Sequence, residues 1–199
     1  QERRKAEPGY NMCKEVVTML GVSSRRIQDR VKEISDCVKG LSTEPQFAPC
    51  QMVSVVKDVF EALSWIADQK SLSLKSEGLE DLPEIVADER RLFNAFYNLI
   101  NNAIPEVSSG GSISIYGKEQ PPGVGILISV ADTGKGMSPE VRDSLFTARA
   151  QSRKAGGTGL GTKIVKDVID AHRGRISVES EVGRGTTFYI HLPLSPPTA

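Results

Sequence analysis

A carboxylate and two glycines occur together in segment 132–137, directly after the apolar run 126–130. That run has the character of a buried strand, so Asp132 is expected where the strand ends. The Asp132 carboxylate can accept a hydrogen bond from the amino group of a flat ring, while Gly134 and Gly136 lack Cβ and let the ring approach the main chain. Asp-Thr-Gly and Lys-Gly are also ordinary turn sequences. The segment therefore predicts either a turn or a binding position for an amine-bearing ring.

Two asparagines one helical turn apart form a second candidate site. The helix expected after the N-cap residue Asp88 has this apolar stripe: Leu92, Ala95, Phe96, Leu99 and Ala103. Asn98 and Asn102 fall together on the edge of that stripe. Asparagine is unfavourable inside helices, and its carbonyl oxygen can ligate a hard cation such as Mg²⁺. The pair is thus either a chance surface feature or a metal-binding one.

A glycine-rich loop, residues 156–161, opens a further helix that should end at His172, where an imidazole commonly caps the last carbonyls. Exposed N–H groups and the positive end of the helix dipole suit a polyphosphate. A mobile linker is the alternative, because a glycine-rich loop alone has low specificity.

These three segments need a scaffold of strands and helices to position them. An amphipathic helix is expected with the buried face Val53, Val56, Phe60, Leu63 and Ala67. A short helix should start at Ser138 and run to Phe146. Alternation of apolar and polar residues predicts strands at 71–75, 84–87, 112–116, 124–130, 176–178 and 187–192. The strand at 124–130 should pair beside the one at 112–116.

The first forty residues follow a different pattern. Apolar positions alternate steps of four and three in a heptad seam: Cys13, Val17, Leu20, Ser24, Ile27, Val31, Ile34, Val38 and Leu41. Such a seam predicts a coiled coil or helical bundle between two chains, with a single helix packed on its own domain as the alternative. A domain boundary is expected near Thr43, which gives a helical dimerisation segment, 1–43, and a second domain, 44–199.

Composition limits the function further. The 199 residues contain 25 Lys plus Arg and 25 Asp plus Glu, so no overall charge favours nucleic acid or an anionic membrane. No apolar run approaches the ~20 residues of a membrane span, and no signal peptide opens the sequence. The three cysteines show no metal-ligand spacing, which indicates a reducing compartment. We therefore expect a cytoplasmic protein without membrane contact, or the cytoplasmic part of a larger membrane-bound sensor.

Together, the Asn pair, the Asp-x-Gly-x-Gly segment and loop 156–161 resemble the N, G1 and G2 boxes of the ATP-binding catalytic domain of sensor histidine kinases, in the same order and spacing. The resemblance covers residues 44–194 and extends to segments 88–92, 174–180 and 185–188. It implies the Bergerat fold of the GHKL superfamily, a two-layer α/β sandwich with a mixed sheet under three helices, preceded by a long dimerisation helix. ATP and Mg²⁺ would lie between the Asn helix and a flexible lid.

The resemblance also implies roles for single residues. The residues expected around the adenine are Asp132, Gly134, Gly136 and Thr187. Asp132 would bind the adenine amino group, Asn102 would be the Mg²⁺ ligand, and the second catalytic residue, Asn98, would lie beside it near the phosphates. The residues expected around the phosphates are Lys154, Gly157, Thr158, Gly159, Leu160 and Gly161.

The sequence departs from the family in two places. Segment 147–154 stands where the family has an aromatic-rich lid, although Phe146 and a basic end remain. Segment 105–107, Pro-Glu-Val, stands where the family is often basic and aromatic. These departures bear on lid closure and on the contacts to the phosphates rather than on nucleotide binding itself.

The resemblance implies an enzyme, a histidine protein kinase that transfers the ATP γ-phosphate to a histidine on a dimerisation helix. Its partners would be ATP, a second copy of the chain and a response regulator. No histidine precedes His172, so the phosphoacceptor is absent from this chain. A catalytically degenerate ATP-binding regulatory module, or a GHKL-type ATPase, is the alternative. Related ATPases carry a general-base Glu where this chain has Asn98, which favours transfer over hydrolysis.

Overall fold

The computed structural model describes residues 44–121, 123–146 and 160–195. The heptad seam, residues 13–41, lies outside these ranges. The elements in chain order are β1 (Ala48–Cys50), α2 (Met52–Gln69), β2 (Ser73–Glu77), β3 (Ile85–Ala87), α3 (Glu89–Ala103), β4 (Ser112–Glu119), β5 (Gly125–Asp132), α4 (Pro139–Ser144), α5 (Leu160–Ala171), β6 (Arg175–Glu181) and β7 (Gly185–Pro193).

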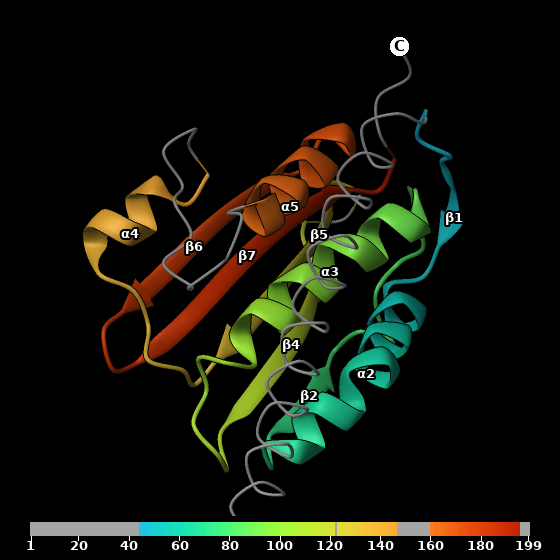
Figure 1. Cartoon of the computed structure of the whole chain (residues 1–199). Coiled ribbons are helices and arrows are strands. Elements are labelled where there is room, and N and C mark those ends of the chain that lie inside the picture. The colour runs from blue at the N-terminus through green and yellow to red at the C-terminus, as the bar shows by residue number, and fades with distance from the viewer. Residues whose placement is uncertain (1–43, 122, 147–159, 196–199) are drawn as a thin grey trace, which may run out of the picture. The chain divides into compact units, whose positions relative to one another are not determined.

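Five strands form a mixed sheet in the order β2-β4-β5-β7-β6 (Figure 1). The edge strand β2 is parallel to β4, and every other neighbouring pair is antiparallel. Strands β1 and β3 form a separate antiparallel pair. The predicted pairing of the strands at 112–116 and 124–130 is confirmed, and both strands extend beyond the predicted bounds because the ladder runs from Ile113 with Asp132 to Glu119 with Ile126.

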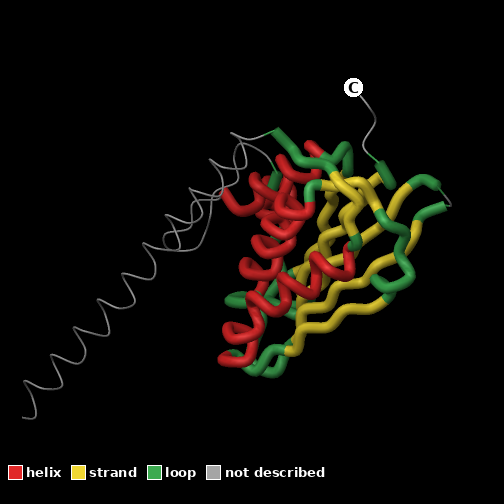
Figure 2. The backbone as a smooth tube through the Cα atoms, turned by 90° about the vertical axis from the view of Figure 1, so that its right-hand side faces the viewer, coloured by secondary structure: helices red, strands yellow, loops and turns green. Residues whose placement is uncertain are grey.

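Helices α2, α3 and α5 cover one face of this sheet (Figures 1 and 2). Side chains alternate along a strand, so every second residue of β4 and β5 faces the helices. The buried strand residues that form this interior are Ile113, Ile115, Ile126, Ile128 and Val130. The structure thereby confirms the predicted α/β sandwich with a mixed sheet under three helices.

The buried face of α2 differs from the predicted one. Met52, Val55 and Val59 are fully buried, whereas Val53 and Phe60, which were expected on that face, are only partly buried. The physical reason is the rotation of the helix about its own axis. Apolar residues flank the predicted stripe on both sides, so the sequence pattern does not show which side of the stripe is buried. The remaining members of the predicted face, Val56, Leu63 and Ala67, are buried as expected.

The ends of the helices follow local chemistry. Asp88 caps α3 as predicted, because its Oδ1 accepts a hydrogen bond from Arg91 N at 3.0 Å. Ser138 precedes α4 without a side-chain capping bond, and the helix ends at Ser144 rather than at Phe146.

A buried imidazole joins α5 to α3. Asp88 N donates to His172 Nε2 at 2.9 Å, so this nitrogen is the acceptor and the other, Nδ1, carries the proton that it donates to Val168 O at 2.7 Å. The capping role expected of His172 is therefore confirmed. Residues before β1 complete the cluster, because Gln46 N donates to Asp88 Oδ2 at 2.9 Å and the Phe47 ring packs edge-on against His172.

Acidification is expected to destabilise the fold through His172. Burial is the main cause that lowers the pKa of His172 from its ordinary value of 6.5, and a proton on Nε2 would oppose the Asp88 N–H. Below that ordinary value the unfolded chain takes up a proton that the folded chain resists, so the free energy of unfolding falls with pH by up to ~1.4 kcal/mol per unit. Urea denaturation between about pH 7.5 and about pH 5.5 measures this slope. His172→Gln should flatten it, and an unchanged slope would contradict the assignment.

Among the helices of the described ranges, none combines the length and the apolar character that crossing a membrane requires.

Candidate functional site

Asp132 ends β5 on the face of the sheet that the helices cover. It is half-buried, and its Oδ1 accepts a hydrogen bond from Gly134 N at 2.7 Å. Burial raises the pKa of the Asp132 carboxyl, while hydrogen bonds from the backbone of Gly134 and Thr186 act in the opposite direction. The site thus presents a carboxylate, fixed by backbone donors, at the end of the central strand of the sheet.

The glycines after Asp132 are required by close packing. A methyl group on Gly134 would come 2.7 Å from Asp132 Oδ1 and 3.0 Å from Glu106 O. Gly136 has φ +65° and a methyl group there would come 2.0 Å from Glu181 O. No other residue fits at Gly136 without a shift of the backbone. The loop is therefore held tightly against two neighbouring segments, one at Glu106 and one at Glu181.

The strand register corrects one predicted site residue. Asp132 lies opposite Thr186, whereas Thr187 lies opposite Ala131. Side chains alternate between the two faces of a strand, so Thr187 points to the face away from Asp132. Thr186 shares the face of Asp132, is buried, and its Oγ1 lies 2.9 Å from Ser180 Oγ. Sequence reasoning missed Thr186 and Ser180, because two adjacent threonines cannot be assigned to faces before the register is known.

The Asn pair lies against the start of α5. Asn98 Nδ2 donates to Asn94 O at 2.8 Å, which leaves its carbonyl oxygen toward Gly161. A methyl group on Gly161 would come 3.3 Å from Asn98 Oδ1 and 3.0 Å from Asn102 Nδ2. The structure therefore brings together Asn98, Asn102 and Gly161, and the absence of a side chain at Gly161 permits this approach.

Glu106 connects the Asn helix with the Asp132 loop. It follows Asn102 by about one helical turn, and its backbone oxygen accepts a hydrogen bond from Lys135 N at 3.2 Å. Its carboxylate forms an ion pair with Lys135 Nζ at 2.6 Å. The two predicted groups of residues thus belong to one continuous wall that runs from α3 to the end of β5.

Four of the residues predicted around the phosphates, Lys154, Gly157, Thr158 and Gly159, lie outside the described residues. Leu160 begins α5. Within the described ranges, no group of three or more His, Cys, Asp or Glu residues could hold a metal ion. A cation at this site would therefore depend on amide oxygens such as those of the Asn pair, together with oxygens of its own ligand.

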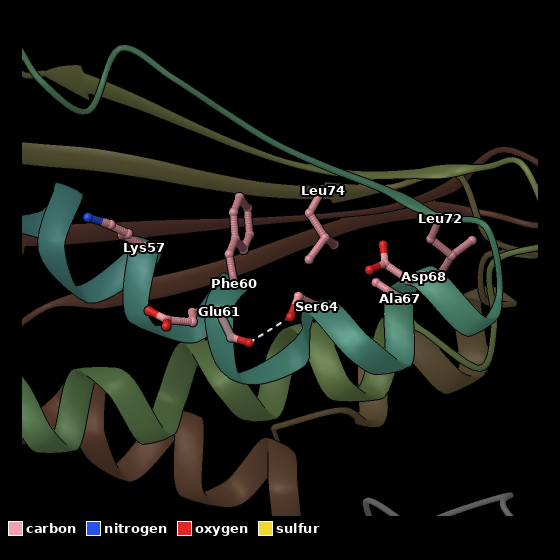
Figure 3. A pocket seen from close by; sticks show the side chains of 8 residues that line it. All are labelled: Lys57, Phe60, Glu61, Ser64, Ala67, Asp68, Leu72 and Leu74. Carbon is pink, nitrogen blue, oxygen red and sulfur yellow. Dashed lines mark hydrogen bonds between the residues drawn. The ribbon is translucent and has the colours of Figure 1, made fainter.

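An open pocket of about 710 Å³ lies elsewhere, between α2 and β2 (Figure 3). Phe60 from the helix and Leu74 from the strand point toward one another across it. The other lining residues are Lys57, Glu61, Ser64, Ala67, Asp68 and Leu72. None of them belongs to the Asn pair or to the Asp132 loop, and the charged members are exposed residues of α2. We therefore place the functional site at the wall from α3 to β5.

Residues 87–196 match the family model of histidine kinase-, DNA gyrase B- and HSP90-like ATPases. The chain belongs to this ATPase family. The matched region of the ATPase domain begins in β3 and contains Asn98, Asn102, Asp132 and Gly161.

The curated relatives of this ATPase domain are sensor kinases. Sensor histidine kinase ZraS of Escherichia coli (strain K12) is 31% identical over 188 residues, which are 94% of this chain and 39% of ZraS. Sensor-like histidine kinase SenX3 of Mycobacterium tuberculosis (strain H37Rv) is 30% identical over 179 residues, which are 86% of this chain and 43% of SenX3. The chain thus spans about two fifths of the length of these relatives.

Solved structures agree with this assignment. Full-length ShkA in complex with AMPPNP has a TM-score of 0.75 and 28% identity, covering 94% of this chain and 40% of ShkA. The nucleotide-free catalytic domain of histidine kinase ThkA has a TM-score of 0.66 and 25% identity, covering 76% of this chain and 97% of that domain. The prediction of an ATP-binding domain of the sensor histidine kinase type is confirmed.

Proposed function

We propose that this chain binds ATP together with Mg²⁺ and serves as the catalytic part of a sensor histidine kinase, passing the γ-phosphate to a histidine on a dimerisation helix. The observation that carries the proposal is Asp132, a half-buried acceptor that is followed by two glycines which the packing keeps free of side chains. Such a position selects a ring that presents an amino group.

Each residue of the wall would have a separate task. Asp132 would accept the hydrogen bond of the adenine amino group, with Thr186 beside it in place of Thr187. Asn102 would ligate the cation, and Asn98 would lie beside it near the phosphates. The residues proposed to enclose the phosphates are Lys154, Gly157, Thr158, Gly159, Leu160 and Gly161. When bound, Mg²⁺ would neutralise charge on the phosphate oxygens.

Incubation with radiolabelled ATP and Mg²⁺ tests this proposal. The isolated chain should bind the nucleotide without becoming labelled, because no histidine precedes His172. Label should appear when a dimerisation helix that carries an acceptor histidine is added. Binding without transfer to any such helix would favour the second candidate, a degenerate ATP-binding regulatory module.

We expect ATP hydrolysis by the isolated chain to stay close to background. A general base would have to accept a proton from water, and the amide at Asn98, whose Nδ2 already donates to Asn94 O, cannot do so at neutral pH. Asn98→Glu supplies a carboxylate at this position and should raise hydrolysis modestly. A colorimetric phosphate assay compares the two proteins. Steady turnover by the unmodified chain that disappears in Asn102→Ala would establish an ATPase instead.

The remaining proposals concern the whole protein. Residues 1–43 would form a dimerisation segment and residues 44–199 the ATP-binding catalytic domain, with the heptad seam joining two copies. Light scattering of the chain measures this association. A response regulator would receive the phosphoryl group from the labelled helix, and the natural location would be the cytoplasm or the cytoplasmic part of a membrane-bound sensor.

A further inference from the structure

Lys70 forms an unusual set of contacts at the end of α2. It is the C-cap residue of that helix and is half-buried. Its ammonium nitrogen donates hydrogen bonds to Ile104 O at 2.8 Å, to Pro105 O at 3.2 Å and to Val107 O at 3.1 Å. All three N–H groups of the ammonium are therefore satisfied by one short segment of backbone.

That segment directly follows the Asn helix, because Ile104 is the C-cap residue of α3 and Pro105 and Val107 lie beyond it. The C-terminus of a helix is the negative end of its dipole, so a cation is favoured beside it. Glu106 lies within the same segment, and its backbone oxygen and carboxylate bind Lys135. Lys70 thus fixes one side of the segment whose other side holds the loop of Asp132.

The turn after Lys70 is attached to the same wall at a second point. Ser71 O accepts a hydrogen bond from Gly110 N at 3.1 Å, and Ser73 N donates to Gly111 O at 3.0 Å. A methyl group on Gly111 would come 2.7 Å from Thr133 Oγ1. Both ends of the connection between α3 and β4 are therefore tied to the α2–β2 turn, which lies at the edge of the sheet in Figure 1.

We propose that Lys70 is a positioning residue for the base-binding wall: by binding the carbonyls of Ile104, Pro105 and Val107, it sets the place of Glu106 and so of the Gly134–Lys135 main chain. This inference rests on the proposed function. It differs from a role at the phosphates, because a residue that acts through the base-binding wall must affect the binding of adenosine and of ATP equally.

Three variants separate these roles. Lys70→Met keeps an unbranched side chain of similar length and removes the ammonium group. Lys70→Arg restores a cation and N–H donors, and Lys57→Met makes the same change at an exposed position of the same helix. Adenosine and ATP affinities are measured by titration, and exchange of the Lys135 amide hydrogen is measured by NMR without nucleotide.

Lys70→Met should weaken the binding of adenosine and of ATP by the same factor, roughly tenfold. This is the lower end of the effect of removing a group that orients a metal ligand, which is also an indirect positioning role. The Lys135 amide should exchange faster, because its acceptor Glu106 O is no longer fixed. Lys70→Arg should recover part of the ligand affinity and part of the protection of the Lys135 amide. Lys57→Met should show the same affinities and the same exchange rate as the unmodified protein.

The outcomes distinguish the inference from the proposed function. If the unmodified protein binds neither ligand, the proposed function fails, while faster Lys135 exchange in Lys70→Met alone still supports the positioning role. Unchanged exchange of the Lys135 amide would overturn the inference. So would a loss of ATP affinity without a loss of adenosine affinity, because Lys70 would then act on the phosphates.

Discussion

Asp132→Ala is expected to weaken ATP binding by roughly ten- to a hundredfold, the equivalent of about 1.5–3 kcal/mol for a hydrogen bond to a charged group. The carboxylate is the acceptor proposed for the adenine amino group, and it also accepts the Gly134 N–H at 2.7 Å. Its removal therefore leaves the ring amine without a partner and frees the loop that forms the wall. Calorimetric titration of both proteins with ATP and Mg²⁺ measures the effect.

Asp58→Ala provides the matched control for this change, because Asp58 is an exposed aspartate on α2. It should leave the affinity unaltered. If Asp132→Ala bound ATP as tightly as Asp58→Ala, the assignment of segment 132–137 as the base-binding loop would be wrong, and the segment would be the ordinary turn that its sequence also permits.

Gly185→Ala is expected to lower the free energy of unfolding by at least about 3 kcal/mol, which is at the upper end of the range for a single substitution. Gly185 has φ +95°, and a methyl group there would come 2.0 Å from Asp132 O. Two penalties combine, since the left-handed backbone costs an L-residue about 1–2 kcal/mol and the obstacle is main chain that cannot rotate away. Urea denaturation measures the loss of stability. The folded fraction of the variant should also bind ATP more weakly, because the atom that the new methyl group displaces is the backbone oxygen of Asp132.

Gly183 allows the two penalties to be separated. It has φ +84°, yet a methyl group there would meet no atom within 4 Å. Gly183→Ala should therefore show only the backbone penalty, about 1–2 kcal/mol. Equal losses for the two variants would mean that the close approach of Gly185 to Asp132 does not contribute.

The sequence predicted the elements of the site better than their mutual placement. Asp132 at a strand end and the Asn pair on one helix follow from periods of two and of about 3.6 residues, which are local properties. The side of the sheet to which Thr187 points depends on which residue pairs with Asp132, and β7 lies more than fifty residues away from β5 in the chain. A shift of one residue in register exchanges the two faces of a strand. The local sequence pattern therefore cannot show which of the two threonines, Thr186 or Thr187, shares the face of Asp132.

Lys70 illustrates a second limit. Its three acceptors are backbone carbonyls that lie 34, 35 and 37 residues later in the chain. Every residue carries a carbonyl, so no residue type marks the partners, and a lysine after a helix ordinarily indicates only a solvated end. Contacts from a side chain to distant backbone become visible only when the fold brings the two segments together.

The pairing of β2 with β4 also shows that the region matched by the family model is shorter than the unit of folding. The match to the family model starts at residue 87, so β1, α2 and β2 precede it in the chain. A fragment cut at that boundary would leave β4 as an unpaired edge and would uncover the side of α3 that α2 packs against. Such a fragment would carry Asn98, Asn102 and Asp132 but would expose apolar surface and a free strand edge, which favours aggregation. The smallest piece that can carry this chemistry as an independent protein is therefore expected to begin before α2.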